Sequence, residues 1–576
     1  GSIGIQALNG ARIQNDGEIR VGASTSTSTG IGMYGENIAG ALTSINNTGN
    51  IIITADKGTG IVTKNMELGG TVTNSGSIKN LSSQVGTIGI YSVINPLFTP
   101  TSVGTGTVTN SGTIELGEDS RGIYANNVKI SNTGSIIVGD SINDTAVGIY
   151  ADKYSEISNS GNMQVGNNGI GYYLDNSKLS ITGGNFDISN LGILVYGLNS
   201  SAIDYLSSTG TSSSSASSLS LAKPVFYLDN STLNFGTANP LFTINNNSIG
   251  VYANNSSIIG SSSYELGQNS VGIYSNNPTT TVKNDVASTI TSIAGSSPNA
   301  KGIVVKNGNV ENAGLIALTG DKAVGVYLEG NGSNTVINTG KVIMNGDEAI
   351  GIYSTGVSSL INNGGEVKVG NSSSLSTPSI GIYTDAASIT STNGKIESGN
   401  NSLGIYSTNP SANISIVGNQ FKVGENGIGI YTNGGQLTLD NTSSFDIANN
   451  SALGVYSKNA TTLSSANMNI GANSFGYLLE TGTLTTNGTG TLENGSVYIY
   501  STQGGSITNT GNLTSINPNG EQTVGIYTTN GETVVNTGNI DLSNGYSNMG
   551  IYTNNGTLSN TGRIDVGGGK YIYDPT

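Results

Sequence analysis

Apolar and polar residues alternate in short blocks along this chain, and one block recurs with little change. In "AVGIYA" (146–151) a glycine precedes a branched aliphatic residue and a tyrosine, and close variants return about every 26 residues from Tyr34 to Tyr552. Such alternation over five or six residues is typical of a half-buried strand. Val62, Val304 and Leu478 stand where the spacing predicts a tyrosine.

A second block follows about ten residues after many of the tyrosines. It reads "ISNTGSI" (130–136) or "LSNTGRI" (558–564), with apolar residues on both sides of an Asn-Thr-Gly or Asn-Ser-Gly turn. Around Tyr150 this pattern predicts strands at 146–151, 156–158 and 162–165. In stacked copies of the turn, we expect the side-chain amides to form ladders; the expected members are Asn132, Asn159, Asn509, Asn536 and Asn560.

Three short strands in each repeat are too few to bury a core of their own, so successive repeats must stack. The prediction is an all-β fold: a single-chain right-handed parallel β-helix of roughly 22 rungs, with about three short strands per rung, continuous over 1–576. A leucine-rich solenoid is the competing repeat fold, but its fixed leucines are missing. The repeat length also differs from the roughly 14-residue repeats of trimeric β-roll heads.

Alternation within "AVGIYA" predicts which side chains face the core. Val147, Ile149 and Ala151 share one face, whereas Gly148 and Tyr150 share the other. Because the residue two after the tyrosine is usually polar, we expect the tyrosines to point outward in a stacked ladder, beside a groove left by the glycines. The ladder is either structural or a platform for sugars or peptides; its expected members include Tyr124, Tyr150, Tyr252, Tyr274, Tyr327, Tyr353, Tyr383, Tyr406, Tyr431, Tyr456, Tyr527 and Tyr552.

Two long intervals interrupt the repeat, and insertions in solenoids become loops on one face. The segment 92–107 and the serine-rich segment 197–224 are therefore predicted as protruding loops. Exposed apolar residues on such loops are candidates for contact with a partner; here they are Pro96, Leu97, Phe98, Ile203, Tyr205 and Leu206. The alternative is that they pack down on the neighbouring rung.

Composition narrows the possible functions. The chain has 576 residues, 85 glycines, no cysteine, no histidine and a formal charge of −15, so nucleic acid is not an expected partner. No apolar run is long enough to span a membrane. The acidic residues are scattered, the densest group being "ELGEDSRG" (115–122), and neither a paired-carboxylate motif nor a calcium-binding nonapeptide occurs. We expect no catalytic activity, no cofactor and no metal.

Rungs that read "VGIYANN" and "ISNTGSIIVG" resemble the passenger domains of large monomeric autotransporter adhesins, especially the outer-membrane adhesins of fusobacteria. The resemblance implies a monomeric extracellular passenger on the bacterial cell surface. It also implies a signal peptide and a C-terminal outer-membrane β-barrel, neither of which is recognisable in the sequence, so we expect an excised fragment.

Three hypotheses for function follow. The first is attachment to host cells through a receptor or glycan, or coaggregation with other bacterial cells. The second is a stiff stalk that presents a binding tip located elsewhere in its parent protein. The third and most distant is a β-helix enzyme that cleaves polysaccharides.

Overall fold

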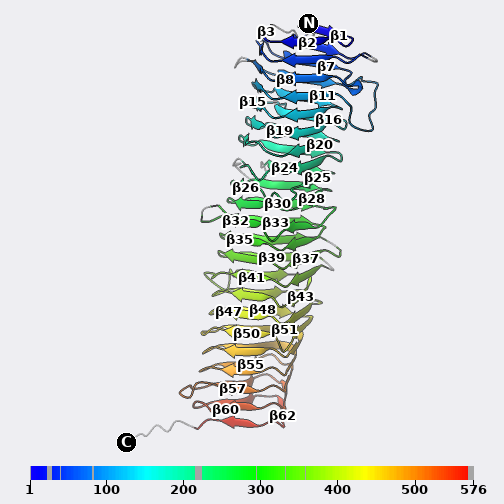
Figure 1. Ribbon diagram of the computed structural model, residues 1–576. Coiled ribbons are helices and arrows are strands. Elements are labelled where there is room, and N and C mark those ends of the chain that lie inside the picture. The colour runs from blue at the N-terminus through cyan, green and yellow to red at the C-terminus, as the bar shows by residue number, and fades with distance from the viewer. Residues whose placement is uncertain are drawn as a thin grey trace. The chain divides into compact units, whose positions relative to one another are not determined.

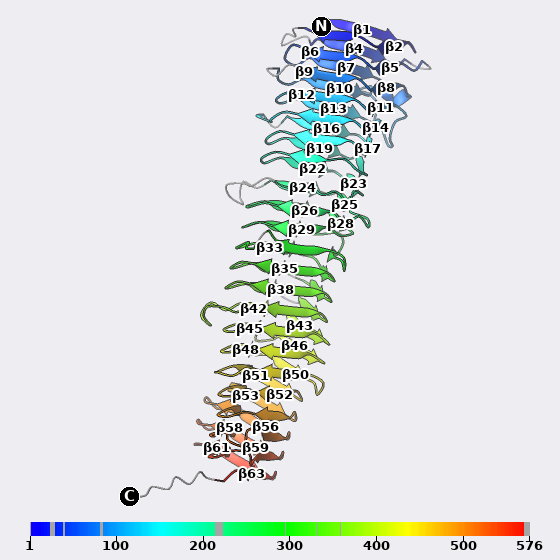
Figure 2. The ribbon, with the colours of Figure 1, turned by 60° about the vertical axis from the view of Figure 1, so that its left-hand side comes forward.

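A computed structural model describes residues 2–22, 29–38, 41–80, 84–143, 145–213, 223–293, 295–330, 332–356 and 359–568. The fold is all-β, with about 22 turns of parallel β-solenoid, and it confirms the predicted right-handed parallel β-helix. The chain divides into two compact units, 1–283 and 284–576. Each unit is a solenoid (Figures 1 and 2), and the continuity of the coil between them stays a prediction.

In unit 1 each complete turn contributes one strand to each of three rows. The first row, which carries the Gly-aliphatic-Tyr block, holds β1 (Ile3–Leu8), β4 (Ile31–Glu36), β7 (Thr59–Lys64), β10 (Ile88–Val93), β13 (Arg121–Asn126), β16 (Val147–Asp152), β19 (Ile170–Asp175), β22 (Ile193–Leu198), β24 (Pro224–Asp229), β27 (Ile249–Asn254) and β30 (Val271–Asn276). The second row holds β2 (Arg12–Asn15), β5 (Ser44–Asn47), β8 (Thr71–Asn74), β11 (Thr107–Asn110), β14 (Lys129–Asn132), β17 (Glu156–Asn159), β20 (Lys178–Ile181), β23 (Ala202–Tyr205), β25 (Thr232–Asn234) and β28 (Ser257–Ile259). The third row holds β3 (Glu18–Val21), β6 (Asn50–Ile53), β9 (Ser77–Asn80), β12 (Thr113–Leu116), β15 (Ser135–Val138), β18 (Asn162–Val165), β21 (Phe186–Ile188), β26 (Leu241–Ile244) and β29 (Ser263–Leu266).

Unit 2 repeats the three rows, and in two of its turns the first and second strands join into one strand of 12 residues. The first row holds β33 (Lys301–Lys306), β36 (Val324–Glu329), β39 (Ile350–Thr355), β42 (Ile380–Thr384), β45 (Leu403–Ser407), β48 (Ile428–Asn433), β51 (Leu453–Ser464), β53 (Phe475–Thr486), β55 (Val497–Ser501), β58 (Val524–Thr528) and β61 (Met549–Thr553). The second row also includes the C-terminal halves of β51 and β53, together with β34 (Val310–Asn312), β37 (Thr335–Asn338), β40 (Leu360–Asn363), β43 (Ser388–Thr392), β46 (Asn413–Val417), β49 (Gln436–Leu439), β56 (Ser506–Asn509), β59 (Thr533–Asn536) and β62 (Thr557–Asn560). The third row holds β32 (Thr289–Ser292), β35 (Leu315–Thr319), β38 (Lys341–Asn345), β41 (Glu366–Val369), β44 (Lys395–Ser398), β47 (Gln420–Val423), β50 (Ser444–Ile447), β52 (Asn467–Ile470), β54 (Gly490–Leu492), β57 (Leu513–Ser515), β60 (Ile540–Leu542) and β63 (Ile564–Val566).

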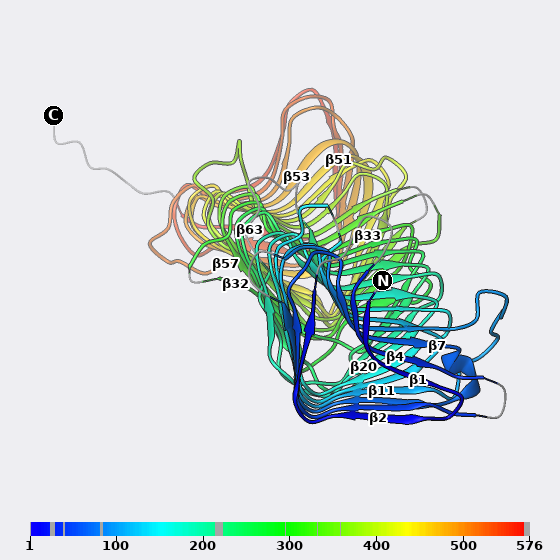
Figure 3. The ribbon, with the colours of Figure 1, turned by 90° about the horizontal axis from the view of Figure 1, so that it is seen from above.

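Two short elements complete the described secondary structure. Strand β31 (Val282–Asn284) lies at the boundary between the units in the sequence, and η1 (Met66–Leu68) is a single turn of 3-10 helix after β7. Within unit 1 neighbouring strands of a row pair in parallel and in register, so equivalent residues form columns; the third row is divided between β21 and β26, which belong to separate sheets. Figure 3 looks along these columns and shows β2, β11 and β20 of the second row one behind another.

The core of unit 1 consists of apolar columns contributed by all three rows. In the second row the middle residue of each strand is buried and stands in register with the next turn; this column includes Val108, Ile130, Ile157, Leu179 and Ile203. A strand spacing of about 4.8 Å keeps these side chains in contact from turn to turn. The stacked core therefore replaces the independent core that a single turn cannot form.

The glycines of the repeated block face the core, contrary to the expectation that they share the tyrosine's outward face. A Cβ atom on Gly148 would lie 2.3 Å from the Met163 Sδ atom and 2.6 Å from the Gly171 carbonyl oxygen. Gly148 and Ile149 are therefore consecutive inward positions, and strict alternation breaks there. Glycine is needed because backbone of the next turn approaches too closely for a side chain, so no outward groove arises from these residues.

The predicted asparagine ladders are present at the corner between the second and third rows. In unit 1 each side-chain Nδ2 donates to the Oδ1 of the asparagine one turn further on, at 2.7–2.8 Å; the ladder consists of Asn15, Asn47, Asn74, Asn110, Asn132 and Asn159. Unit 2 contains two shorter ladders, formed by Asn284, Asn312, Asn338 and Asn363 and by Asn509, Asn536 and Asn560. Within each ladder neighbouring amides satisfy one another, and in unit 2 only the first acceptors, Asn284 Oδ1 and Asn509 Oδ1, are buried without a partner among the ladder residues.

Candidate functional site

The tyrosines lie half-buried on the outward face of the first row and stack on one another. In unit 1 the stack runs without interruption from Tyr91 to Tyr274, with centroid distances of 4.4–5.3 Å between neighbouring rings. In unit 2 the column is interrupted at Leu478; it contains Tyr327, Tyr353, Tyr383, Tyr406, Tyr431 and Tyr456, followed by Tyr500, Tyr527 and Tyr552. Neighbouring tyrosines cover the ring faces within a stack, which favours a structural role over a platform for sugars.

Charged side chains contact the rings where the tyrosine column is interrupted. Lys64, on the same strand as Val62, places its Nζ 5.7 Å from the centroid of the Tyr34 ring. Lys301, on the strand of Val304, lies at the same distance from the ring of Tyr327. A cation over an aromatic ring is attracted to its π-face. Next to Val62 and Val304, lysine side chains of the protein itself therefore occupy the ring faces that a neighbouring tyrosine would otherwise cover.

The loop between β10 and β11 exposes apolar side chains at its tip. Residues 94–106 contain no strand, Leu97 is 91% exposed, Phe98 is 43% exposed and Pro96 is also exposed. The base of the loop is held to its neighbours: the Asn95 backbone N–H donates to Glu67, and the Asn127 Nδ2 donates to the Ser102 carbonyl oxygen at 2.7 Å. The loop thus presents two large apolar side chains to solvent from a fixed base.

The serine-rich segment does not expose all three residues expected there. Ile203 and Tyr205 belong to β23 and are 1% and 0% exposed, which corrects the prediction that they lie on a protruding loop. Ile203 pairs with Leu179 and Leu233 in neighbouring turns, because the alternation of "AIDY" continues the second row. Leu206, just after the strand, is 45% exposed. Residues 214–222 of the predicted loop lie outside the described residues.

Tyr205 is buried because it completes an aromatic cluster inside unit 1. Its ring lies 5.5–6.1 Å, centroid to centroid, from four phenylalanines, namely Phe186, Phe226, Phe235 and Phe242. Several of these pairs meet edge to face, an arrangement that aromatic quadrupoles favour. Burial raises the pKa of the Tyr205 hydroxyl, so this tyrosine stays neutral.

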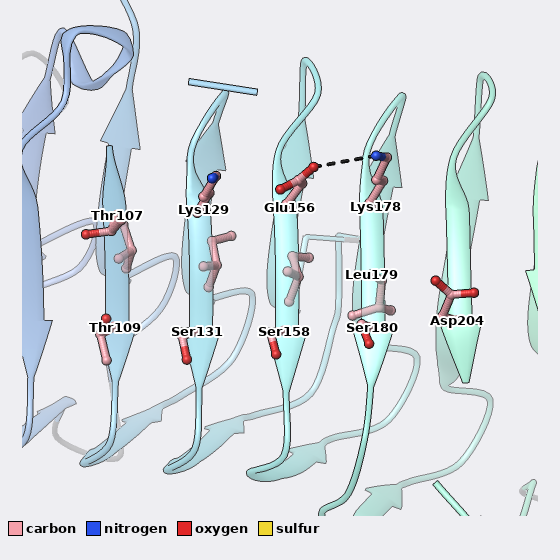
Figure 4. A pocket seen from close by; sticks show the side chains of 13 residues that line it. Thr107, Thr109, Lys129, Ser131, Glu156, Ser158, Lys178, Leu179, Ser180 and Asp204 are labelled. Carbon is pink, nitrogen blue, oxygen red and sulfur yellow. Dashed lines mark ion pairs between the residues drawn. The ribbon is translucent and has the colours of Figure 1, made fainter. Parts of the chain in front are cut away.

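A hollow of about 490 Å³ lies on the outward face of the second row, across β11, β14, β17, β20 and β23 (Figure 4). Its floor is the backbone around the buried residues Val108, Ile130, Ile157 and Leu179. One side of the hollow carries a charged column, which we define as Thr107, Lys129, Glu156 and Lys178. The other side carries a hydroxyl column, which we define as Thr109, Ser131, Ser158 and Ser180, with Asp204 at its end.

The loop and the hollow are neighbours in the chain, because Gly106 ends the loop and Thr107 begins β11. Within the charged column, Lys178 Nζ lies 3.5 Å from a Glu156 carboxylate oxygen. Asp204 accepts a hydrogen bond from the Asn234 side chain at 2.8 Å. Sequence reasoning missed this hollow, since its lining comes from the outward positions of five turns and emerges only when the register is known.

Among the described residues, no group of three or more His, Cys, Asp or Glu side chains is placed to hold a metal ion, and no helix is long and apolar enough to cross a membrane. Asp152, two residues after Tyr150, is a carboxyl with a strongly shifted pKa. Burial, with a smaller contribution from Asp175, raises the pKa of Asp152 to about 6. It lies beside the tyrosine column, and Asp175 occupies the same column one turn further on.

The chain matches no protein-family model, no curated protein and no solved structure.

Proposed function

We propose that this chain is an extracellular segment of a bacterial surface adhesin of the autotransporter type, which attaches to host cells or other bacteria through protein or glycan contacts. The proposal is carried by one observation: Leu97 and Phe98 are exposed at the tip of a loop whose base is hydrogen-bonded to neighbouring turns. Large exposed apolar side chains on a protrusion are typical of a contact surface. The stacked columns supply the stiff scaffold that carries the loop.

A second candidate is a stalk that binds nothing itself. The uniform tyrosine stacks and asparagine ladders favour it, because they stabilise the coil along many turns without forming a distinct site. In that case the apolar loop is incidental, and binding is located elsewhere in the parent protein.

Attachment can be measured with the purified chain, labelled and incubated with host epithelial cells and with whole bacterial cells. We expect saturable binding to at least one cell type, and a loss of about tenfold or more in the variant Leu97→Ser/Phe98→Ser, because two apolar contacts disappear. Val286→Ser is the matched control, since Val286 is 82% exposed and lies in the other unit. Absence of binding to every cell type would favour the stalk, whereas an equal loss in the control would show that the tip of the loop is not the contact.

A further inference from the structure

We propose that the hollow across β11–β23 binds a linear, uncharged oligosaccharide of hexose or N-acetylhexosamine units, with its chain running across the strands along the hydroxyl column. This inference deepens the glycan contact of the proposed function and assigns it to a surface other than the apolar loop. It rests on three features of the hollow: unoccupied hydroxyls in register, a charged edge of small net charge, and a length of five strands.

The hydroxyl column offers hydrogen-bonding groups that are not used within the protein. Across the described part of the chain, the hydroxyls of Thr109, Ser131, Ser158 and Ser180 make no hydrogen bond to another protein group. Figure 4 shows these side chains along the same side of the hollow on consecutive strands. A hydroxyl both donates and accepts, so such a column suits a ligand that carries many hydroxyls of its own.

The spacing of the column selects the type of polymer. In-register strands repeat every ~4.8 Å, which is close to the advance of one sugar unit in an extended polysaccharide. An extended peptide repeats its side chains on one face only every second residue, at about 6.6–6.8 Å, and falls out of step after two strands. A linear glycan can therefore place one sugar unit over each strand, whereas a peptide cannot.

The charges of the hollow favour an uncharged ligand. Lys178 is paired with Glu156, and Asp204 balances Lys129, so the lining has no net charge. The chain as a whole carries −15, which repels a polyanionic glycan at long range. Lys129, Glu156 and Lys178 can still donate or accept hydrogen bonds at the sugar hydroxyls. The structure therefore favours a neutral glycan over an acidic one.

The test is a glycan array probed with the full chain, followed by calorimetric titration of the oligosaccharides that bind. We expect neutral linear oligosaccharides to bind, with an affinity that rises up to four or five sugar units and then levels off, because the hollow spans five strands. The variant Ser131→Ala/Ser158→Ala/Ser180→Ala keeps the outward positions small. It should bind about tenfold or more weakly, since several hydrogen bonds are lost together.

The chain itself offers a matched control. Thr390, Ser415 and Thr438 form an equivalent hydroxyl column on the second row of unit 2, but the adjacent column there is Ser388, Asn413 and Gln436 and carries no charge. Replacement of these three hydroxyl residues by alanine should leave oligosaccharide binding unchanged.

The two proposals fail in distinguishable ways. Leu97→Ser/Phe98→Ser should keep the oligosaccharide affinity even where it abolishes attachment to cells. The glycan inference is overturned if no neutral oligosaccharide binds at millimolar concentration, if only acidic glycans or peptides bind, or if the unit 2 control weakens binding equally. Loss of cell attachment with intact oligosaccharide binding in this variant would support the loop as the cell contact and leave the glycan site in place.

Discussion

Two stretches of unit 1 keep the same coil with opposite chemistry at the same corner. From β2 to β17 the last residue of each second-row strand is an asparagine in a buried amide ladder. From β20 onward Ile181 and Tyr205 occupy that position, and aromatic rings fill the space behind it. The coil therefore does not depend on one corner residue. It requires either complete hydrogen bonding or complete packing, because a buried amide without a partner and an empty cavity are both costly.

Of the two stretches, the one packed with aromatic rings around Tyr205 should lose more stability when a side chain is truncated. Tyr205→Ala removes a fully buried ring from among four phenylalanines and should destabilise unit 1 by about 3–5 kcal/mol. Tyr205→Phe keeps the ring and should cost much less. Urea unfolding, monitored by hydrogen exchange of the amides in β20–β26, measures the stability of both variants. Equal losses of stability in the two variants would contradict the packing explanation.

In the asparagine ladder of unit 1, we expect the loss of stability on substitution to depend on the position of the residue in the ladder. Asn110→Ala leaves the Asn74 donor and the Asn132 acceptor without partners, so it should cost about 2–4 kcal/mol. Asn15 begins the ladder, and Asn15→Ala deprives the Asn47 acceptor of its amide partner and leaves only the exposed Gly17 N–H to bond water, for about 1–2 kcal/mol. The same unfolding measurement on both variants tests this difference, and an end substitution as costly as the internal one would argue against a hydrogen-bonded ladder.

On the outward face of the first row, partial burial leaves one carboxylate, that of Asp152, in an unfavourable position. Burial raises the pKa of Asp152 to about 6, above its ordinary value of 3.8. An acid with a raised pKa favours the folded state while it is protonated, and this contribution is lost as pH rises from about 4 to about 6. Asn126 occupies the same column one turn earlier. Asp152→Asn should therefore stabilise unit 1 at pH 7 by about 1–2 kcal/mol, after allowance for its partial exposure, and by almost nothing at pH 4.

Unfolding measured at both pH values checks this prediction for Asp152. Asp175→Asn in the next turn removes only the smaller contribution that Asp175 makes to the raised pKa of Asp152, so it should give a smaller gain in stability at pH 7. A gain from Asp152→Asn that is equal at pH 7 and pH 4 would show that the carboxylate charge is not its source.

The smallest effect is expected for an ion-pair cluster on the third row of unit 2. Glu397 pairs with Lys368 at 2.7 Å and with Lys395 at 3.1 Å. Burial opposes its ionisation, but these lysine hydrogen bonds outweigh burial and hold the pKa of Glu397 below its usual value. Its stabilisation is present above pH 4.5 and is lost as pH falls below that value. Glu397→Gln should cost no more than about 1 kcal/mol at neutral pH, and high salt should reduce the cost.

The fold could be predicted because the repeat has a nearly fixed period, so that successive turns pair in register. The same pairing predicts the tyrosine stacks and the asparagine ladder that contains Asn132. Three features needed the structure. Gly148 was assigned to the wrong face because the strand breaks alternation there. Tyr205 was expected on a loop because the serine-rich sequence that follows it is typical of loops, yet Ala202–Tyr205 form a strand. The hollow depends on which outward residues share a column, and only the register between turns defines that.

We propose that the regular columns hold the coil together and that the loop at 94–106 makes the contact with a cell. The chain has no cysteine, so Leu97→Cys and Val286→Cys each provide a single site for a bulky maleimide label. Attachment of the labelled and unlabelled variants to the cells that bind the original chain is the most direct test. We expect the label at position 97 to abolish attachment and the label at position 286 to leave it intact. Full attachment with position 97 labelled would contradict a contact through this loop.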